Sequence, residues 1–292
     1  MARLFATPLL VTALLAASLY YPAEVSREIP ILMYHHILDV PPEEVPNNAT
    51  ISYQTFRTHI ETLYHAGFTA IRFDELIAFV DEGRDLPSRP VIITFDDGYR
   101  SNLELAAPVL AEYGMQATIH VVGIARGRDT HWVSGEPITP HFSWDEARPW
   151  VQSGVIDIQH HSYNMHHARA HEPEENFRHG VLQREGENDQ DYRAAFIEDW
   201  IALVEIMQSE IGTIPAVFAY PFGRYTEATE AMLRELGVRV TLTTRFGVNT
   251  VRRGDSESLR LLNRINMSEA NGPERVIEET QTIGSTKLWL AS

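Results

Sequence analysis

The sequence contains no cysteine among its 292 residues. This absence excludes disulfide bonds, thiolate metal ligands, a cysteine nucleophile and a lipidated N-terminal cysteine. Any bound metal ion must therefore be held by histidine and carboxylate side chains. Basic residues are also scarce, because 24 lysines and arginines stand against 40 aspartates and glutamates, for a net charge of −16. So acidic a surface repels phosphate backbones, and we expect no nucleic-acid partner.

A long uncharged run occurs at the N-terminus, from Leu4 to Tyr21. Arg3 precedes it, and small residues lie near its end at Ala16 to Ser18. This order of features predicts a secretory signal peptide over residues 1–23. The alternative is an uncleaved N-terminal membrane anchor, because the run is just long enough to span a bilayer. In both cases we expect the rest of the chain to be exported (secreted, periplasmic or at the cell surface), with this segment as its membrane contact.

The sequence also lacks internal repeats, low-complexity tracts and a proline- or glycine-rich linker, so we expect residues 29–292 to form one domain. Short apolar runs there alternate with amphipathic stretches. The predicted strands cover residues 29–34, 69–73, 91–95, 116–122, 155–161, 216–220, 238–243 and 259–265. The predicted helices cover residues 53–66, 74–81, 102–113, 143–153, 190–211, 226–236 and 273–283. Repeated strand-then-helix units predict an α/β fold, a single distorted (β/α) barrel with about seven parallel strands.

Two adjacent carboxylates, Asp96 and Asp97, follow the strand predicted over residues 91–95. In parallel barrels, chemistry gathers at the carboxyl ends of the strands. Two neighbouring acids at such an end repel each other and lose hydration, unless a cation lies between them or one of them is protonated. An isolated Asp-Asp-Gly sequence is commonly only a turn, so the interpretation needs a second signal.

That signal is a group of four of the chain's 13 histidines within residues 156–167, after another predicted strand. Side chains alternate between the faces of a strand, so we expect His161 to face the barrel interior and His160 the outside. The chain then turns, and His166 can return toward the same point. Two imidazoles and one carboxylate make an open site for a catalytic divalent metal, and the other carboxylate remains free as a general base. From the residues alone, either aspartate could fill either role.

The segments Thr94–Tyr99 and His161–His166 resemble the two signature motifs of the NodB-type polysaccharide deacetylases, carbohydrate esterase family four. The resemblance covers nearly all of residues 29–267. It implies that Asp96 is the catalytic base, and that Asp97 holds the metal ion together with the two histidines of the second motif. We expect zinc in this site, with cobalt or nickel as alternatives.

The step between the two histidines departs from the family's commonest pattern. Most members have three residues between them, which would make Met165 the ligand position, but four residues intervene here. The longer step resembles the subgroup that deacetylates poly-β-1,6-N-acetylglucosamine in biofilm matrices. In that subgroup a circular permutation places the general-acid histidine in a Tyr-His sequence near the start of the chain. His35 matches that position, and His36 is the alternative.

The segment Phe218–Gly223 resembles a third family motif, which supplies an oxyanion donor and often an arginine that orients the base. Pro221 has no N–H group, so the resemblance implies that the backbone of Phe222 is the donor. Ala219 stands in the usual place of the arginine, and Arg264 is a candidate to replace it.

Aromatic residues near these motifs are candidates for substrate binding. Trp144 and Tyr220 could stack on sugar faces, as could Phe222, although an ordinary role in the hydrophobic core is the alternative for each. The resemblance implies metal-assisted removal of N-acetyl groups from a polysaccharide, poly-β-1,6-N-acetylglucosamine in the first place. The alternatives are peptidoglycan, chitin oligomers, O-acetylated xylan, or a carbohydrate-binding relative without activity. We expect a monomer.

Overall fold

The computed structural model describes residues 26–166 and 177–278, so the expected signal peptide or anchor at residues 1–23 lies outside the described residues. The strands are β1 (Ser26–Ile29), β2 (Ile31–Tyr34), β3 (His36–Leu38), β4 (Thr50–Ser52), β5 (Thr69–Ala70), β6 (Pro90–Phe95), β7 (Ala117–Val121), β8 (Ile156–His160), β9 (Val217–Ala219), β10 (Val240–Leu242), β11 (Asn249–Arg252) and β12 (Ile265–Asn266). The α-helices are α1 (Tyr53–His65), α2 (Phe73–Asp81), α3 (Ala107–Glu112), α4 (Trp144–Ser153), α5 (Asp189–Ile211) and α6 (Glu227–Glu235). None of the helices in the described ranges is long and apolar enough to cross a membrane.

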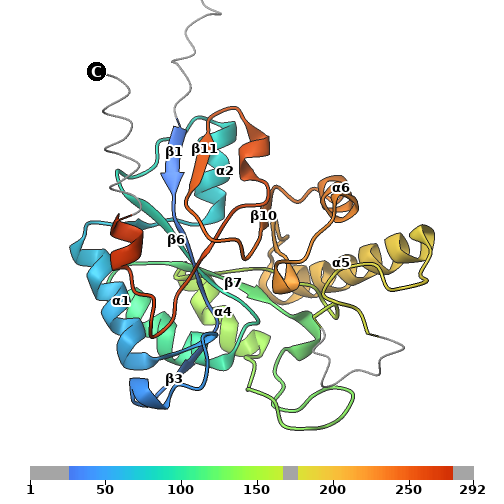
Figure 1. Cartoon of the computed structure of the whole chain (residues 1–292), viewed down its shortest axis with the longest axis horizontal. Coiled ribbons are helices and arrows are strands. Elements are labelled where there is room, and N and C mark those ends of the chain that lie inside the picture. Colours follow the sequence, from blue (N-terminus) through green and yellow to red (C-terminus); the bar gives the residue numbers. More distant parts are fainter. Residues whose placement is uncertain (1–25, 167–176, 279–292) are drawn as a thin grey trace, which may run out of the picture.

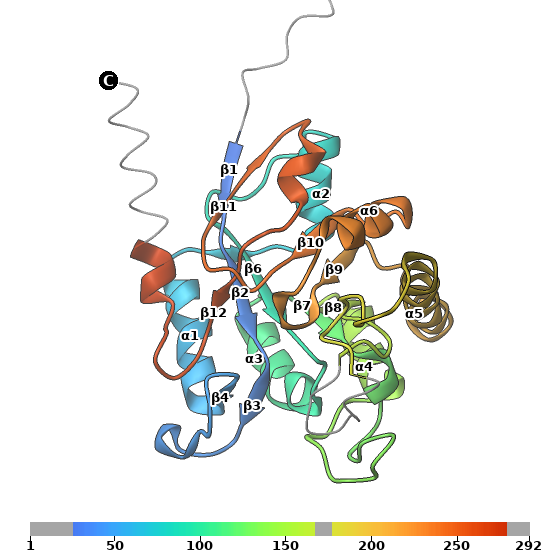
Figure 2. The ribbon, with the colours of Figure 1, turned by 45° about the vertical axis from the view of Figure 1, so that its right-hand side comes forward.

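Seven parallel strands form one curled sheet in the order β10-β9-β8-β7-β6-β2-β12, and β5 pairs with the start of β6. The helices lie around the outside of these strands (Figures 1 and 2). At the open side, a parallel bridge between Leu242 and Leu262 brings the chain before β12 against β10. The expected distorted (β/α) barrel with about seven parallel strands is confirmed.

The sheet separates an outer hydrophobic layer from a two-part interior. On its outer face, residues such as Ile93 and Ile158 pack with the helices in the largest core cluster. Inside, the amino-terminal end is apolar, because Ile31 and Ile92 pack against Phe73 of helix α2. The carboxyl-terminal end of the interior holds polar groups instead, so the fold places a polar site on an apolar base.

Most helix ends follow from local capping. The Ser52 hydroxyl accepts a hydrogen bond from the Thr55 N–H at the start of α1. A capping box between Ser143 and Glu146 begins α4. The sequence predicted both helices within one residue at each end, because the caps lie next to a clear amphipathic pattern.

Most other predicted elements match the structure, but a few segments differ. The predicted strand 259–265 is wrong: a short 3-10 helix covers Ser256–Leu259, and β12 begins only at Ile265. The predicted strand 69–73 shrinks to β5, because Phe73 already opens α2. The helix predicted over residues 102–113 begins as a π-helix at Asn102–Ala106. The antiparallel pair β1–β11 and the pair β3–β4 were not predicted.

Candidate active site

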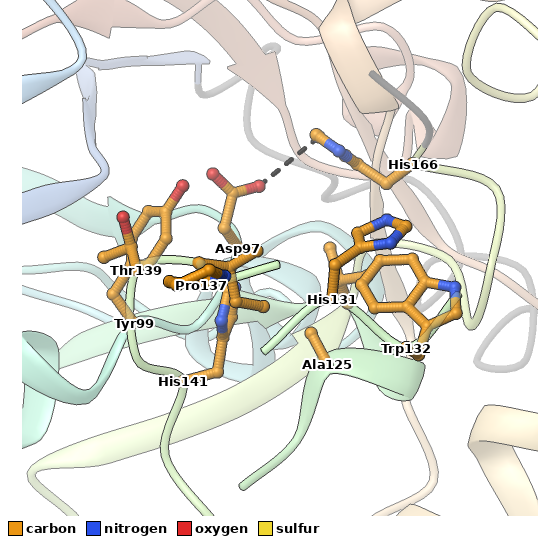
Figure 3. A pocket seen from close by; sticks show the side chains of 11 residues that line it. Asp97, Tyr99, Ala125, His131, Trp132, Pro137, Thr139, His141 and His166 are labelled. Atoms are coloured by element: carbon orange, nitrogen blue, oxygen red, sulfur yellow. Dashed lines mark ion pairs between the residues drawn. The ribbon is translucent and has the colours of Figure 1, made fainter. Parts of the chain in front are cut away.

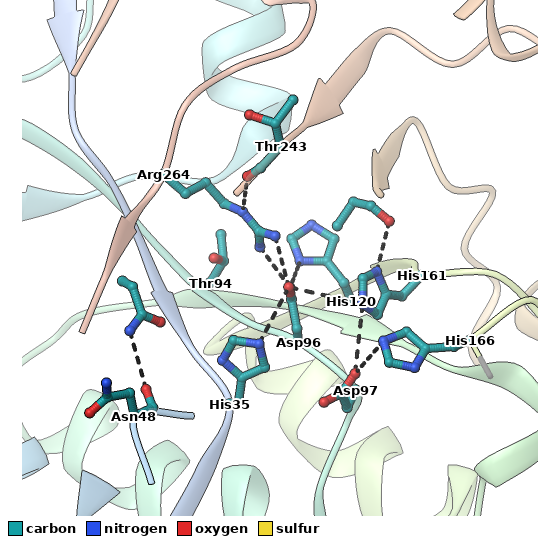
Figure 4. Close-up of polar contacts among 12 residues, drawn as sticks. His35, Asn48, Thr94, Asp96, Asp97, His120, His161, His166, Thr243 and Arg264 are labelled. Atoms are coloured by element: carbon teal, nitrogen blue, oxygen red, sulfur yellow. Dashed lines mark hydrogen bonds and ion pairs between the residues drawn. The ribbon is translucent and has the colours of Figure 1, made fainter. Parts of the chain in front are cut away.

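The carboxyl ends of four parallel strands bring the predicted residues together. His35 follows β2, Asp96 follows β6, His161 follows β8, and Phe222 lies three residues after β9. These strands lie within one run of neighbours in the sheet, so their ends share one edge. Figure 4 shows His35, His161 and Arg264 pointing toward Asp96.

The Asp-Asp-Gly turn separates the two carboxylates. Asp97 and Gly98 both adopt left-handed backbone angles, with φ of 70° and 78°. The Arg126 guanidinium donates hydrogen bonds to the carbonyl oxygens of Asp97 (2.6 Å) and Gly98 (2.8 Å), and these bonds stabilise the turn. A Cβ at position 98 would lie 2.3 Å from that guanidinium, so this close approach requires glycine. The turn leaves Asp96 directed into the barrel and Asp97 toward a cavity.

Asp97, His161 and His166 form a group whose potential ligand atoms all lie within 4.8 Å of one another. The Oδ1 atom of Asp97 lies 3.6 Å from His161 Nε2 and 3.3 Å from His166 Nε2. His161 Nδ1 donates a hydrogen bond to the Ala219 carbonyl oxygen at 2.7 Å, which leaves the Nε2 lone pair facing the group.

This group fits a divalent metal ion by its chemistry. Burial lowers the pKa of His161 to about 4, so its imidazole is neutral at pH 7 and can act as a ligand. Burial alone would raise the pKa of Asp97, but the imidazoles of His166, His35 and His161 lower it below its ordinary value. Asp97 Oδ1 is buried and has no hydrogen-bond partner within the described part of the chain. Such an orphaned oxygen costs about 1–3 kcal/mol unless a cation satisfies it.

Asp96 lies in a different environment, held by a buried arginine. Arg264 donates two parallel hydrogen bonds to its carboxylate, at 2.7 Å to Oδ1 and 2.8 Å to Oδ2. His120 Nδ1 lies 3.2 Å from Oδ1 on the interior side. Burial raises the pKa of Asp96, but the Arg264 charge, followed by His161, outweighs it and leaves the pKa well below the usual range. Arg264, the candidate for the missing arginine, thus lies where that role requires.

His35, and not His36, faces the carboxylates. His35 Nε2 lies 3.9 Å from Asp96 Oδ2, and the Asn102 side-chain amide donates a 2.7 Å hydrogen bond to the His35 carbonyl oxygen. His36 turns the other way, with its Nδ1 2.9 Å from the Ser101 hydroxyl. The alternation of side chains along an extended segment produces this difference.

His160 faces the helices, as the alternation predicts, yet it is completely buried. Its ring stacks on Trp200 of α5 with centroids 4.2 Å apart. Its Nδ1 accepts a hydrogen bond from the Ser162 N–H at 2.9 Å. His160 points outward as expected, but it also supports the loop between His161 and His166.

Of the three aromatic candidates for substrate binding, Tyr220 lies in the hydrophobic core and Trp144 packs against it. The assignment of Tyr220 to substrate binding is wrong, because the residue is fully buried and its hydroxyl donates a 2.6 Å hydrogen bond to Glu230 of α6. Trp144 is half-buried and packs against the main core cluster. Phe222 is 42% exposed, with φ of 57°, and its ring centroid lies 4.4 Å from that of His166. Phe222 therefore borders the group that Asp97 and the histidines form.

A cavity of about 410 Å³ opens beside Asp97 and His166. Its other walls come from the segment after β7 and from the residue that follows the Asp-Asp-Gly turn (Figure 3). Those walls are Tyr99, Val122, Ala125, His131, Trp132, Pro137, Ile138, Thr139 and His141. The lining combines aromatic and apolar side chains with the polar groups of one aspartate, one threonine and three histidines, a mixture that suits an organic ligand with polar substituents.

Sequence reasoning did not single out Trp132, which lines this cavity. Its indole stacks on the His131 ring with centroids 4.2 Å apart and forms one wall of the cavity. The segment that contains Trp132 shows no periodicity. The signal that could have indicated this residue was the His-Trp pair in a polar segment.

Comparison with known families and proteins agrees with this geometry. A family model described as Polysaccharide deacetylase matches residues 83–241. The matched part contains Asp96, Asp97, His161 and His166, whereas His35 and Arg264 lie outside it.

Individual relatives are distant. The chain is 26% identical over 230 residues to the YxkH protein of Bacillus subtilis (strain 168), covering 79% of this chain and 69% of that protein. It is 23% identical over 186 residues to the poly-β-1,6-N-acetyl-D-glucosamine N-deacetylase of Escherichia coli (strain K12), covering 60% of this chain but only 28% of that protein. The solved structure of a de-N-acetylase from Aggregatibacter actinomycetemcomitans superposes with a TM-score of 0.73 at 20% identity, covering 86% of this chain and 99% of that one.

Proposed function

The chain belongs to the polysaccharide deacetylase family, and from this membership we propose that it is a metal-dependent N-deacetylase of an extracellular glycan, poly-β-1,6-N-acetylglucosamine. The observation that carries the proposal is the pairing of two carboxylates with distinct surroundings: Asp97 among imidazoles, and Asp96 on an arginine, one residue apart. The four-residue gap between His161 and His166 and the similarity to the Escherichia coli enzyme favour this substrate.

Asp97, His161 and His166 would hold a divalent ion, for which zinc is our choice among zinc, cobalt and nickel. Such an ion supplies Lewis-acid polarisation of a carbonyl and a lower pKa for a bound water. The protein's part is to present one carboxylate oxygen and two imidazole nitrogens that already lie close together. The Ala219 carbonyl oxygen fixes the tautomer of His161 for that purpose.

In the proposed mechanism Asp96 acts as the general base. It removes a proton from the attacking water, and the new C–O bond forms at the acetyl carbonyl carbon. The backbone N–H of Phe222 donates to the oxyanion that develops. His35 then gives a proton to the nitrogen as the C–N bond breaks. Acetic acid and a glucosamine unit leave, and the acid ionises to acetate. The one proton that Asp96 took from the water passes to solvent, and His35 takes a proton from solvent.

Assays of acetate release would test the proposal. The purified protein should release acetate from poly-β-1,6-N-acetylglucosamine, faster than from chitin oligomers, peptidoglycan or acetylated xylan. Prior treatment with a chelator should remove the activity, and added zinc should restore it. Faster release from xylan would point to an esterase, and binding without release on every glycan would point to a carbohydrate-binding relative.

The proposed acid gives a pH-dependent prediction. His35→Ala should lower turnover by about two orders of magnitude, because proton donation to the leaving amine is lost. The fall of activity at alkaline pH should disappear as well, because a protonated histidine is no longer needed. The measurement is turnover against pH for the wild type and the variant. His36→Ala is the matched control, since its side chain contacts Ser101 and should leave the profile unchanged. An unaltered profile in His35→Ala would assign the acid to another residue.

The cavity wall gives a prediction on substrate affinity. Trp132→Ala should raise KM about two- to tenfold with kcat nearly constant, because a stacked aromatic contributes about 0.5–1.5 kcal/mol to binding. The adjacent Val133→Ala is the control, because Val133 is 68% exposed and does not line the cavity. Steady-state kinetics on oligosaccharides decide the matter. A fall in kcat at constant KM would contradict a role in substrate binding.

A further inference from the structure

The loop between His161 and His166 is held by an unusual set of hydrogen bonds. All four backbone N–H groups between His161 and His166 donate hydrogen bonds to side chains. Ser162 donates to His160 Nδ1 at 2.9 Å, Tyr163 to Asp199 Oδ2 at 2.7 Å, Asn164 to Asp199 Oδ1 at 2.6 Å, and Met165 to the Ser162 hydroxyl at 3.2 Å. Side-chain acceptors, and not the backbone pairing of a helix or sheet, therefore fix the conformation of this loop.

Asp199 supplies two of these acceptors from the middle of helix α5. Each of its oxygens receives one N–H, in short charge-assisted hydrogen bonds. Burial raises the pKa of Asp199 to about 6, and the two N–H groups of Asn164 and Tyr163 oppose that rise. The carboxylate is thus partly buried, in a position that suits fixed hydrogen bonding.

The next residue of the same helix holds the other end of the loop. The Trp200 carbonyl oxygen lies 3.3 Å from His160 Nε2, and His160 Nδ1 accepts from Ser162. One neutral tautomer, protonated at Nε2, satisfies both contacts, and burial keeps His160 neutral by lowering its pKa to about 3. Two consecutive residues of α5 therefore support the loop: Asp199 directly, and Trp200 through His160.

The carbonyl side of the loop is also fixed. Gly123 N–H donates to the Ser162 carbonyl oxygen at 3.0 Å, and Ile124 N–H donates to that of Tyr163 at 2.9 Å. Ser162 has a φ of 76°, which a non-glycine residue keeps only where its surroundings determine it. The loop is thus clamped between the segment after β7 and helix α5.

We propose that Asp199 is a positioning residue of the metal site, which holds the loop so that the Nε2 atoms of His161 and His166 face Asp97 together. The inference rests on the proposed function, since it assigns how the same site is pre-formed. Without Asp199, two N–H groups lose their partners and the loop gains freedom. The ion would then have to order the loop as it binds, which weakens its affinity.

The test is zinc binding to metal-free protein, measured by calorimetry or chelator competition. Asp199→Ala should bind zinc about 10- to 100-fold more weakly than the wild type, as is typical when a group that orients metal ligands is removed. Asp199→Asn offers one acceptor for two N–H groups and should also weaken binding at least about tenfold. Glu198→Ala is the matched control, because it removes the same charge from an exposed neighbour on α5 and should keep the wild-type affinity.

A second readout separates positioning from general stability. At saturating zinc the KM of the Asp199 variants should match the wild type, whereas the zinc concentration for half-maximal activity should rise with the zinc Kd. Folded Asp199 variants with wild-type zinc affinity would overturn the inference while leaving the proposed function intact. So would a failure of both variants to fold even with excess zinc, because Asp199 would then serve the fold as a whole. A wild-type protein that binds no divalent ion would overturn the proposed function and this inference with it.

Discussion

Replacing Asp97 with alanine is expected to abolish metal binding and acetate release together. Asp97 contributes the negative charge of the group, and its Oδ1 lies between the two imidazoles. Two histidines without a carboxylate make a weak site for a divalent cation. We expect metal affinity to fall by more than about 100-fold and turnover to fall to the background rate. Metal content after dialysis and acetate release would be measured on the same sample.

His161→Ala and His166→Ala should behave in the same way, because ligands that act as a unit each cost nearly the whole activity. His141→Ala is a suitable comparison for metal content, since His141 lines the same cavity but lies outside the ligand group. His160→Ala is unsuitable, although its side chain faces away from the metal-binding group, because it supports the loop through Ser162. Full metal retention in His161→Ala would contradict the assignment of ligands.

The position of these ligands could be predicted because it depends on two simple periodicities. Parallel strands place their carboxyl ends at one edge, and alternation along β8 directs His161 inward and His160 toward α5. Both rules follow from the predicted strands and need no knowledge of side-chain contacts between distant segments. The resemblance to a family added the distinction between Asp96 and Asp97, which the residues alone left open.

The parts of the site that escaped prediction depend on contacts between distant segments. Tyr220 lies at the end of a strand like the candidate site residues, but its hydroxyl pairs with Glu230 of α6 and its ring packs in the core. Asp199 looks like any acidic residue of a partly exposed helix until the loop is seen against it. Trp132 lies in a loop without periodicity. Local patterns carry no information on such pairings.

Arg264 lies between these two cases. Its segment was predicted as a strand over 259–265, which is wrong, yet the residue was a candidate for the arginine that orients the base. The structure brings it across the barrel to Asp96, 168 positions away in the sequence. That segment lies at the open side of the barrel. It is held there by the bridge between Leu242 and Leu262 and by the pairing of β12 with β2. Long-range pairing, and not strand propensity, positions the guanidinium.

The second large effect is expected from Asp96→Asn, which should separate catalysis from metal binding. The substitution keeps the shape of the side chain but removes the base, so turnover should fall by about two to four orders of magnitude. Zinc affinity should remain near the wild-type value, because Asp96 is outside the ligand group. Asp97→Asn, one residue away, should instead lose the ion. The contrast between two isosteric changes at neighbouring positions makes the test specific.

Stability provides a further measurement on the same variant. Asp96→Asn leaves the buried Arg264 guanidinium without its counter-charge, and breaking a buried ion pair in this way costs up to about 3–5 kcal/mol of unfolding free energy. Because the pKa of Asp96 is depressed, the pair stabilises the protein above the usual carboxylate range, and this contribution is lost as pH falls through the depressed pKa. The variant should therefore lack this part of the acid dependence of stability.

A double variant, Asp96→Asn with Arg264→Met, distinguishes loss of the base from loss of structure. Removing the unpaired guanidinium should restore part of the unfolding free energy, because methionine packs in the buried position without a charge. Turnover should stay as low as in Asp96→Asn, since the general base is still absent. Chemical denaturation and acetate release, with zinc content as the control, would be compared across the single and double variants. If turnover recovered together with stability, Asp96 would serve to hold the site, and the base would be another residue.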